Sequence, residues 1–135
     1  MAGYSGTPLL KKIGIKSGDR VFVVNEPNEF MGLLGELPDG SIVVGKPKSD
    51  LNVGILFTTS AADLKKRFGT ARKLLVQNGM LWVAWPKKSS GVDTDLNEDV
   101  VRDIGLAEGM VDTKVCAIDE TWSGLRFVIR LKDRK

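Results

Sequence analysis

An apolar run over residues 80–85 constrains the fold of this chain more than any other segment. It shows no alternation of polar and apolar side chains, which is typical of a strand buried on both faces of a parallel sheet covered by helices. Pro86 ends this strand, because proline has no N–H to donate to the next strand. Similar runs over residues 20–25 and 53–58 predict two further buried strands.

The best-marked helix begins after Ser60, which can accept a hydrogen bond from the N–H of Asp63. Asp63 can reach back to complete a capping box, and Asn78 and Gly79 are expected to end the helix. Residues 120–124 join the last two strands, so that pair is expected to be antiparallel. The remaining expected elements are short helices over residues 7–14 and 26–34, an edge strand over 41–44, a helix from Asp95 to Gly109, and strands over 110–119 and 125–131.

Together these elements predict an α/β fold, a three-layer Rossmann-like sandwich whose mostly parallel sheet has an antiparallel last strand. With 135 residues, the chain is expected to form a single domain over residues 1–135. No apolar run approaches the ~20 residues of a membrane span. The first residues lack a charged region followed by a long apolar one, so we expect a cytoplasmic protein that does not bind membranes.

Composition excludes several classes of chemistry. The chain has no histidine, which rules out Ser-His-Asp and Cys-His catalysis and removes the commonest metal ligand. Its single cysteine, Cys116, excludes an internal disulfide and is expected to be a buried thiol. An acidic group at the start of the second long helix is explained by the helix dipole, and its spacing matches no metal loop: Asp93, Asp95, Glu98 and Asp99.

The net charge of +3 is mild, and the basic residues 130–135 supply much of it. Binding of single-stranded nucleic acid needs aromatic side chains between the basic ones, and this tail has none. We therefore expect a solvated tail and no nucleic-acid partner.

Polar residues follow the predicted parallel strands, at the edge where ligands bind in α/β sheets. Lys87, Lys88 and Ser89 could hold an anion, although a solvated loop explains them equally well. Trp122 lies in a tight connection and could either cover the sheet end or form a wall for a ligand ring. The full set of candidate ligand-binding residues is Asn25, Glu26, Thr58, Trp85, Lys87, Lys88, Ser89, Asp95, Glu120, Trp122 and Ser123.

Two nucleotide-binding motifs are excluded. Residues 40–47 approach the phosphate-loop formula, but their centre is a β-branched strand and Pro47 stands where a magnesium-binding hydroxyl is needed. Residues 25–29, which follow the first buried strand, contain none of the glycines of a dinucleotide fingerprint.

Three motifs, over residues 1–9, 81–88 and 119–125, resemble a family of small bacterial proteins of unknown function. The chain is more distantly similar to class I S-adenosylmethionine-dependent methyltransferases, through residues 15–21, 79–83 and the closing strand pair. That likeness implies a strand order of second, first, third, fourth, sixth, fifth. Residues 25–29 replace the glycine loop that holds the cofactor in that family, so we expect no cofactor bound in the usual mode.

The leading functional hypothesis is therefore a non-catalytic module that binds a small anionic ligand or a protein partner. One alternative is a divergent S-adenosylmethionine-dependent transferase that uses Glu26, Asp95 or Glu120 as a base, which requires burial to raise the pKa of that carboxylate. A second alternative is a scaffold that forms a homodimer through an exposed apolar patch or edge strand.

Overall fold

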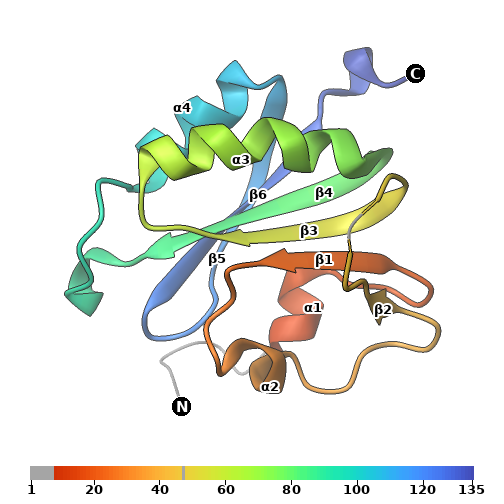
Figure 1. The fold of residues 1–135 in the computed structure, drawn as a ribbon, viewed down its shortest axis with the longest axis horizontal. Helices are drawn as coiled ribbons and strands as arrows, with labels where there is room; N and C mark the ends of the chain where they lie inside the picture. The colour runs from red at the N-terminus through yellow and green to blue at the C-terminus, as the bar shows by residue number, and fades with distance from the viewer. Residues whose placement is uncertain (1–7, 47) are drawn as a thin grey trace.

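The computed structural model describes residues 8–46 and 48–135 and contains a six-stranded sheet in the order β2-β1-β3-β4-β6-β5 (Figure 1). Strands β1 to β4 are parallel to one another, whereas β6 is antiparallel to both β4 and β5. The predicted fold class and strand order are confirmed. The strands are β1 (Arg20–Val24), β2 (Ile42–Val43), β3 (Leu51–Phe57), β4 (Leu75–Pro86), β5 (Met110–Ala117) and β6 (Trp122–Ile129).

Helices cover both faces of this sheet (Figure 1). Helices α1 (Leu9–Ile13) and α2 (Phe30–Leu34) lie on one face, and the longer α3 (Ala61–Leu74) and α4 (Glu98–Ala107) lie on the other. Two single turns of 3-10 helix, Lys88–Ser90 and Leu131–Asp133, complete the described elements. None of the described helices combines the length and apolarity needed to cross a bilayer.

The predicted apolar run of β4 supplies both cores. Trp82 and Ala84 point to the α1 and α2 side, whereas Leu81, Val83 and Trp85 point to the α3 and α4 side. Because successive side chains of a strand point to opposite faces, only an unbroken apolar run can fill both layers.

The helix starts are partly as predicted. Ser60 caps α3 by accepting a hydrogen bond from the N–H of Asp63 at 3.0 Å. The Asp63 carboxylate, however, accepts from the Thr58 hydroxyl instead of completing a capping box. Helix α4 begins after Asn97, whose side chain accepts from the N–H of Val100 at 2.9 Å. It therefore starts later than the Asp95 signal predicted.

The predicted end of α3 at Gly79 is wrong. The helix ends at Leu74, and Leu75 already pairs with Leu51 of the neighbouring strand β3. A side chain at Gly79 would place its Cβ only 3.1 Å from the backbone oxygen of Asn52. Gly79 is thus required by close backbone contact inside the sheet and not by a helix end. The predicted helix cap Thr7 and the excluded phosphate-loop position Pro47 lie outside the described residues.

Candidate functional site

The carboxyl ends of the parallel strands form one edge of the sheet, and several candidate residues meet there (Figure 1). The N–H of Thr58 donates to the backbone oxygen of Ala84 at 3.0 Å, and the N–H of Lys87 donates to that of Thr121 at 2.7 Å. Pro86 pairs with Trp122. These contacts bring together the segments at Thr58, Lys87 and Trp122, three of the four expected at this edge; the fourth, at Asn25, follows β1.

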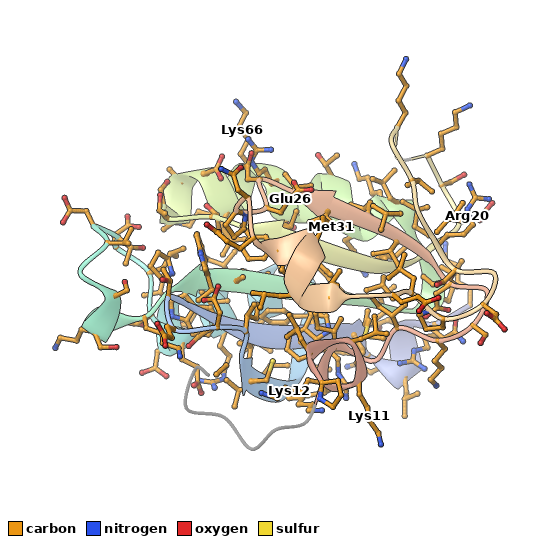
Figure 2. The ribbon with its side chains drawn as sticks, turned by 90° about the horizontal axis from the view of Figure 1, so that it is seen from below. Lys11, Lys12, Arg20, Glu26, Met31 and Lys66 are labelled. Atoms are coloured by element: carbon orange, nitrogen blue, oxygen red, sulfur yellow. The ribbon has the colours of Figure 1, made fainter. Side chains whose placement is uncertain are left out.

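The strand order reverses direction between β1 and β3. From β1 the chain continues to its neighbour β2 on one side, and from β3 it continues to its neighbour β4 on the other side. Such a switch point opens a crevice at the carboxyl ends of the two strands, where α/β proteins bind ligands. Asn25 stands there directly after β1, with a left-handed φ of 59°. Asparagine is among the few residues other than glycine that adopt this conformation readily. Exposed Glu26, labelled in Figure 2, follows this turn.

The two candidate tryptophans lie on opposite faces of the sheet. Trp122 belongs to the α1 and α2 core, where its ring meets that of Phe57 edge-on at 5.1 Å. Trp85 is 5% exposed and belongs to the α3 and α4 core, and Ser123 is its pairing partner. The two indole rings therefore cannot flank the same ligand.

The loop after β4 is held to the amino end of α3. The Thr94 hydroxyl donates to the backbone oxygen of Thr59 at 2.6 Å, and Asp95 accepts from the N–H of Ala61 at 2.8 Å. Beneath this loop is a pocket of about 480 Å³, to which candidate residues Trp85 and Lys88 contribute. Candidate Ser89 is exposed. The pocket lining is Trp85, Pro86, Lys88, Gly91, Val92, Asp93, Thr94, Leu96 and Asn97.

The three carboxylates considered as bases, Glu26, Asp95 and Glu120, are all exposed. The Asp95 carboxylate also accepts a hydrogen bond from the backbone N–H of Ala61, the first residue of α3. The burial that a carboxylate base requires is therefore absent from all three.

A linked group of polar side chains lies at the start of α3 and joins candidate Thr58 to Asp63 and Arg67, which were not among the candidate residues. The Thr58 hydroxyl and the Arg67 Nε each donate to Asp63 at 2.8 Å, one to each carboxylate oxygen. The hydrogen bond from Arg67, and then that from Thr58, lowers the pKa of Asp63 below its ordinary value, although burial opposes this. The spacing of Asp63 and Arg67 by four helical residues was the available signal.

A groove of about 360 Å³ lies beside this group, between α3 and strands β1 and β3. Nothing in the sequence indicates it, because it depends on which strands the helices leave uncovered. Its lining residues are Phe22, Val24, Leu56, Lys66, Arg67, Thr70, Ala71 and Leu74.

Cys116 was expected to be a buried thiol and is half-buried. It packs against the α1 and α2 core, and burial raises the pKa of its thiol despite the nearby Lys12 and Lys114. Within residues 8–46 and 48–135, no group of three or more acidic or cysteine side chains is arranged to hold a metal ion.

No family model and no curated protein sequence matches this chain. Solved structures do match it in fold. A SAM-dependent methyltransferase from Aquifex aeolicus matches with a TM-score of 0.62 at 14% identity, over 88% of this chain and 86% of its own. Magnesium protoporphyrin IX methyltransferase from Synechocystis, with bound SAH, matches with a TM-score of 0.57 at 9% identity, over 90% and 78%.

Fibrillarin from Aeropyrum pernix, with natively bound S-adenosylmethionine, matches with a TM-score of 0.52 at 14% identity, over 94% of this chain and 71% of its own. At these identities the likeness concerns the fold. It agrees with the strand order that the sequence resemblance implied. The chain has the Rossmann-like fold of the class I S-adenosylmethionine-dependent methyltransferases.

Proposed function

We propose that this chain is a divergent S-adenosylmethionine-dependent transferase that binds its methyl donor at the carboxyl ends of β1 and β3. The observation that carries the proposal is the left-handed turn at Asn25, directly after β1 and at the switch point of a methyltransferase-type sheet. The transferase was an alternative in the sequence analysis, and it now ranks above the non-catalytic module. The fold of the solved neighbours supports this change, because three of them were solved with SAM or SAH bound.

Because residues 25–29 contain no glycine, the proposed binding mode differs from that of a glycine loop. A glycine loop lets its backbone approach a ligand closely, whereas residues 25–29 here carry side chains throughout. Asn25 keeps the sharp turn without glycine, so the donor would contact the turn and the exposed side chains that follow it. In this proposal exposed Glu26 accepts hydrogen bonds from the donor's ribose hydroxyls or its ammonium group.

The exposure of Glu26, Asp95 and Glu120 restricts the chemical class of the methyl acceptor. Without a buried base, the acceptor must already be nucleophilic at neutral pH, as a carboxylate or a thiolate is. Its lone pair attacks the methyl carbon of the sulfonium, the carbon–sulfur bond breaks, and the sulfur keeps the bonding electrons. No proton moves in this step, so neither histidine nor a base of raised pKa is required.

The first experiment is titration calorimetry of the full chain with S-adenosylmethionine and S-adenosylhomocysteine. We expect saturable binding, little change in Asn25→Gly, and binding about tenfold weaker in Asn25→Val, because a left-handed conformation costs a β-branched residue about 1–2 kcal/mol. Both substitutions remove the amide, so the pair separates the turn from the side chain. Absence of heat with either ligand would reject the proposal.

A second candidate is the anion-binding module of the sequence analysis, located in the pocket beneath the β4–α4 loop. The specific observation in its favour is that exposed Lys88 lines a polar pocket of about 480 Å³. Asp93 lines the same pocket and opposes an anion there. Thermal-shift measurements with inorganic phosphate and pyrophosphate test it. Stabilisation that is lost in Lys88→Gln supports it, and no stabilisation of the unmodified chain rejects it.

A further inference from the structure

The groove between α3 and strands β1 and β3 is a second recess, separate from the pocket under the β4–α4 loop. Its floor is apolar: Phe22 and Leu56 are buried, and Val24 and Leu74 are half-buried beside them. These half-buried side chains still expose apolar surface to water. A ligand with an apolar body would be favoured in the groove, because its binding would remove that surface from water. The volume of about 360 Å³ falls at the lower end of the ~300–1,000 Å³ typical of small-molecule pockets.

Two cationic side chains of α3, Lys66 and Arg67, also line this groove. Figure 2 shows Lys66 extending from α3 into solvent on the same side of the view as Glu26. Val24, the last residue of β1, also lines the groove, so the recess reaches the carboxyl edge of the sheet.

The guanidinium of Arg67 is held in place before any ligand arrives. Its Nε donates to Asp63, which in turn accepts the hydroxyl of Thr58 at the end of β3. Its two terminal nitrogens have no hydrogen-bond partner among the described residues, and neither has the Lys66 ammonium. A fixed guanidinium fork with free N–H groups matches the two oxygens of a carboxylate. The neighbouring Lys66 adds a second positive charge for the same anion.

We propose that this groove binds a small amphiphilic carboxylate, with the carboxylate on Arg67 and Lys66 and the aliphatic or aromatic body on Phe22, Val24, Leu56 and Leu74. Apart from the two cations and Thr70 the lining is apolar, which fits one anionic head and one tail. The small volume favours a free acid over a protein segment. This inference concerns binding alone and does not depend on methyl transfer.

The test uses octanoate as the probe, with octan-1-ol as the uncharged compound of the same chain length. Calorimetric titration is performed on the full chain and on three variants: Arg67→Gln, Leu74→Gln and Lys65→Gln. Lys65 is exposed on the same helix and does not line the groove, so Lys65→Gln is the matched control for loss of one charge. Circular dichroism and thermal melting of each variant show that it is folded under the titration conditions.

We expect octanoate to bind at least about tenfold more tightly than octan-1-ol, because charge-assisted hydrogen bonds to Arg67 are available only to the acid. Arg67→Gln and Leu74→Gln should each weaken octanoate binding about tenfold or more, and Lys65→Gln should change it less than twofold. Equal affinity for the acid and the alcohol, equal losses in Arg67→Gln and Lys65→Gln, or no saturable octanoate binding would each overturn the proposal.

Discussion

The two faces of the sheet are built differently. On the α1 and α2 face, aromatic side chains close the core: Trp82 is fully buried, and the rings of Phe30, Phe57 and Trp122 meet edge to face in a row. On the α3 and α4 face, the core is closed over the middle strands, but a groove remains beside β1. The closed face is expected to carry more of the stability, and the open face more of the binding capacity.

The chain's connections explain this difference. After β1 the chain goes to α2, on the closed face, and between Val43 and Leu51 the described residues form no helix. The connections that follow β1 and β2 therefore place no described helix over these strands on the α3 and α4 face (Figure 1). The short helices α1 and α2, with their large aromatic partners, close one face. On the opposite face, α3 and α4 do not extend over β1 and β2.

The largest effect is expected from Trp82→Ala. Trp82 fills the closed face and its indole N–H donates to the backbone oxygen of Ile13 at 2.9 Å. Its removal leaves a cavity and an unpaired acceptor, so we expect a loss of about 3–5 kcal/mol in the free energy of unfolding, measured with urea.

Leu74→Ala, on the groove, is the comparison for the open face. Leu74 is only half-buried, so we expect a loss of about 1 kcal/mol in the same measurement. Equal losses in Trp82→Ala and Leu74→Ala would remove the distinction between the faces.

An effect smaller than that of Trp82→Ala is expected where α4 packs on the open face. An added Cβ at Gly105 would lie 2.1 Å from the ring of Phe127, so the ring or the helix must move. We expect Gly105→Ala to lower the free energy of unfolding by about 1–3 kcal/mol through overpacking. Thermal and urea unfolding measure this.

Gly32→Ala is the matched control, because Gly32 is also helical but has no atom within 4 Å of the added Cβ. Alanine there should raise stability by roughly 0.5–1 kcal/mol, since it restricts the unfolded chain. Opposite signs for the two substitutions indicate a tightly packed contact between α4 and β6. The same sign in both would show that backbone entropy, and not the Phe127 contact, determines the effect.

The sequence predicted the strands and their order, but not the details that depend on register. Long apolar runs identify buried strands directly. Gly79 was predicted to end a helix. The structure instead explains this glycine by its close approach to the backbone of Asn52 on a neighbouring strand. Asp95 was expected to start α4, but its carboxylate accepts from the N–H of Ala61 and Asn97 caps the helix instead.

The candidate site shows the same limit. The carboxyl edge followed from the order of strands, and the structure brings Thr58, Lys87 and Trp122 to it. The separation of Trp85 from Trp122 depends on the pairing of Pro86 with Trp122, which sequence alone does not give. The groove beside β1 arises from the absence of a covering helix, so no local motif could indicate it.

The smallest effect on stability is expected at Arg67, the residue proposed to give the open face its anion site. Arg67 and Asp63 are an exposed pair one helical turn apart, so we expect Arg67→Gln to lower the free energy of unfolding by only about 0.3–0.5 kcal/mol at pH 7. The hydrogen bond from Arg67 is the main reason why the pKa of Asp63 lies below its ordinary value of 3.8. A lowered carboxyl pKa stabilises the fold above the ordinary value, and this contribution is lost as the pH falls through the folded-state pKa.

The difference between the unmodified chain and Arg67→Gln should therefore be constant from pH 5 to pH 8 and shrink as the pH falls below 3.8, through the lowered pKa of Asp63. Urea unfolding at pH 7, 5 and 3 measures it, with Lys65→Gln as a variant that loses a charge without losing a bond to Asp63. A difference at pH 3 as large as that at pH 7 would mean that the Arg67 stem acts by packing. A small, pH-dependent loss of stability beside a tenfold loss of octanoate binding would show that Arg67 contributes to the open face as a ligand-binding residue and not as a structural one.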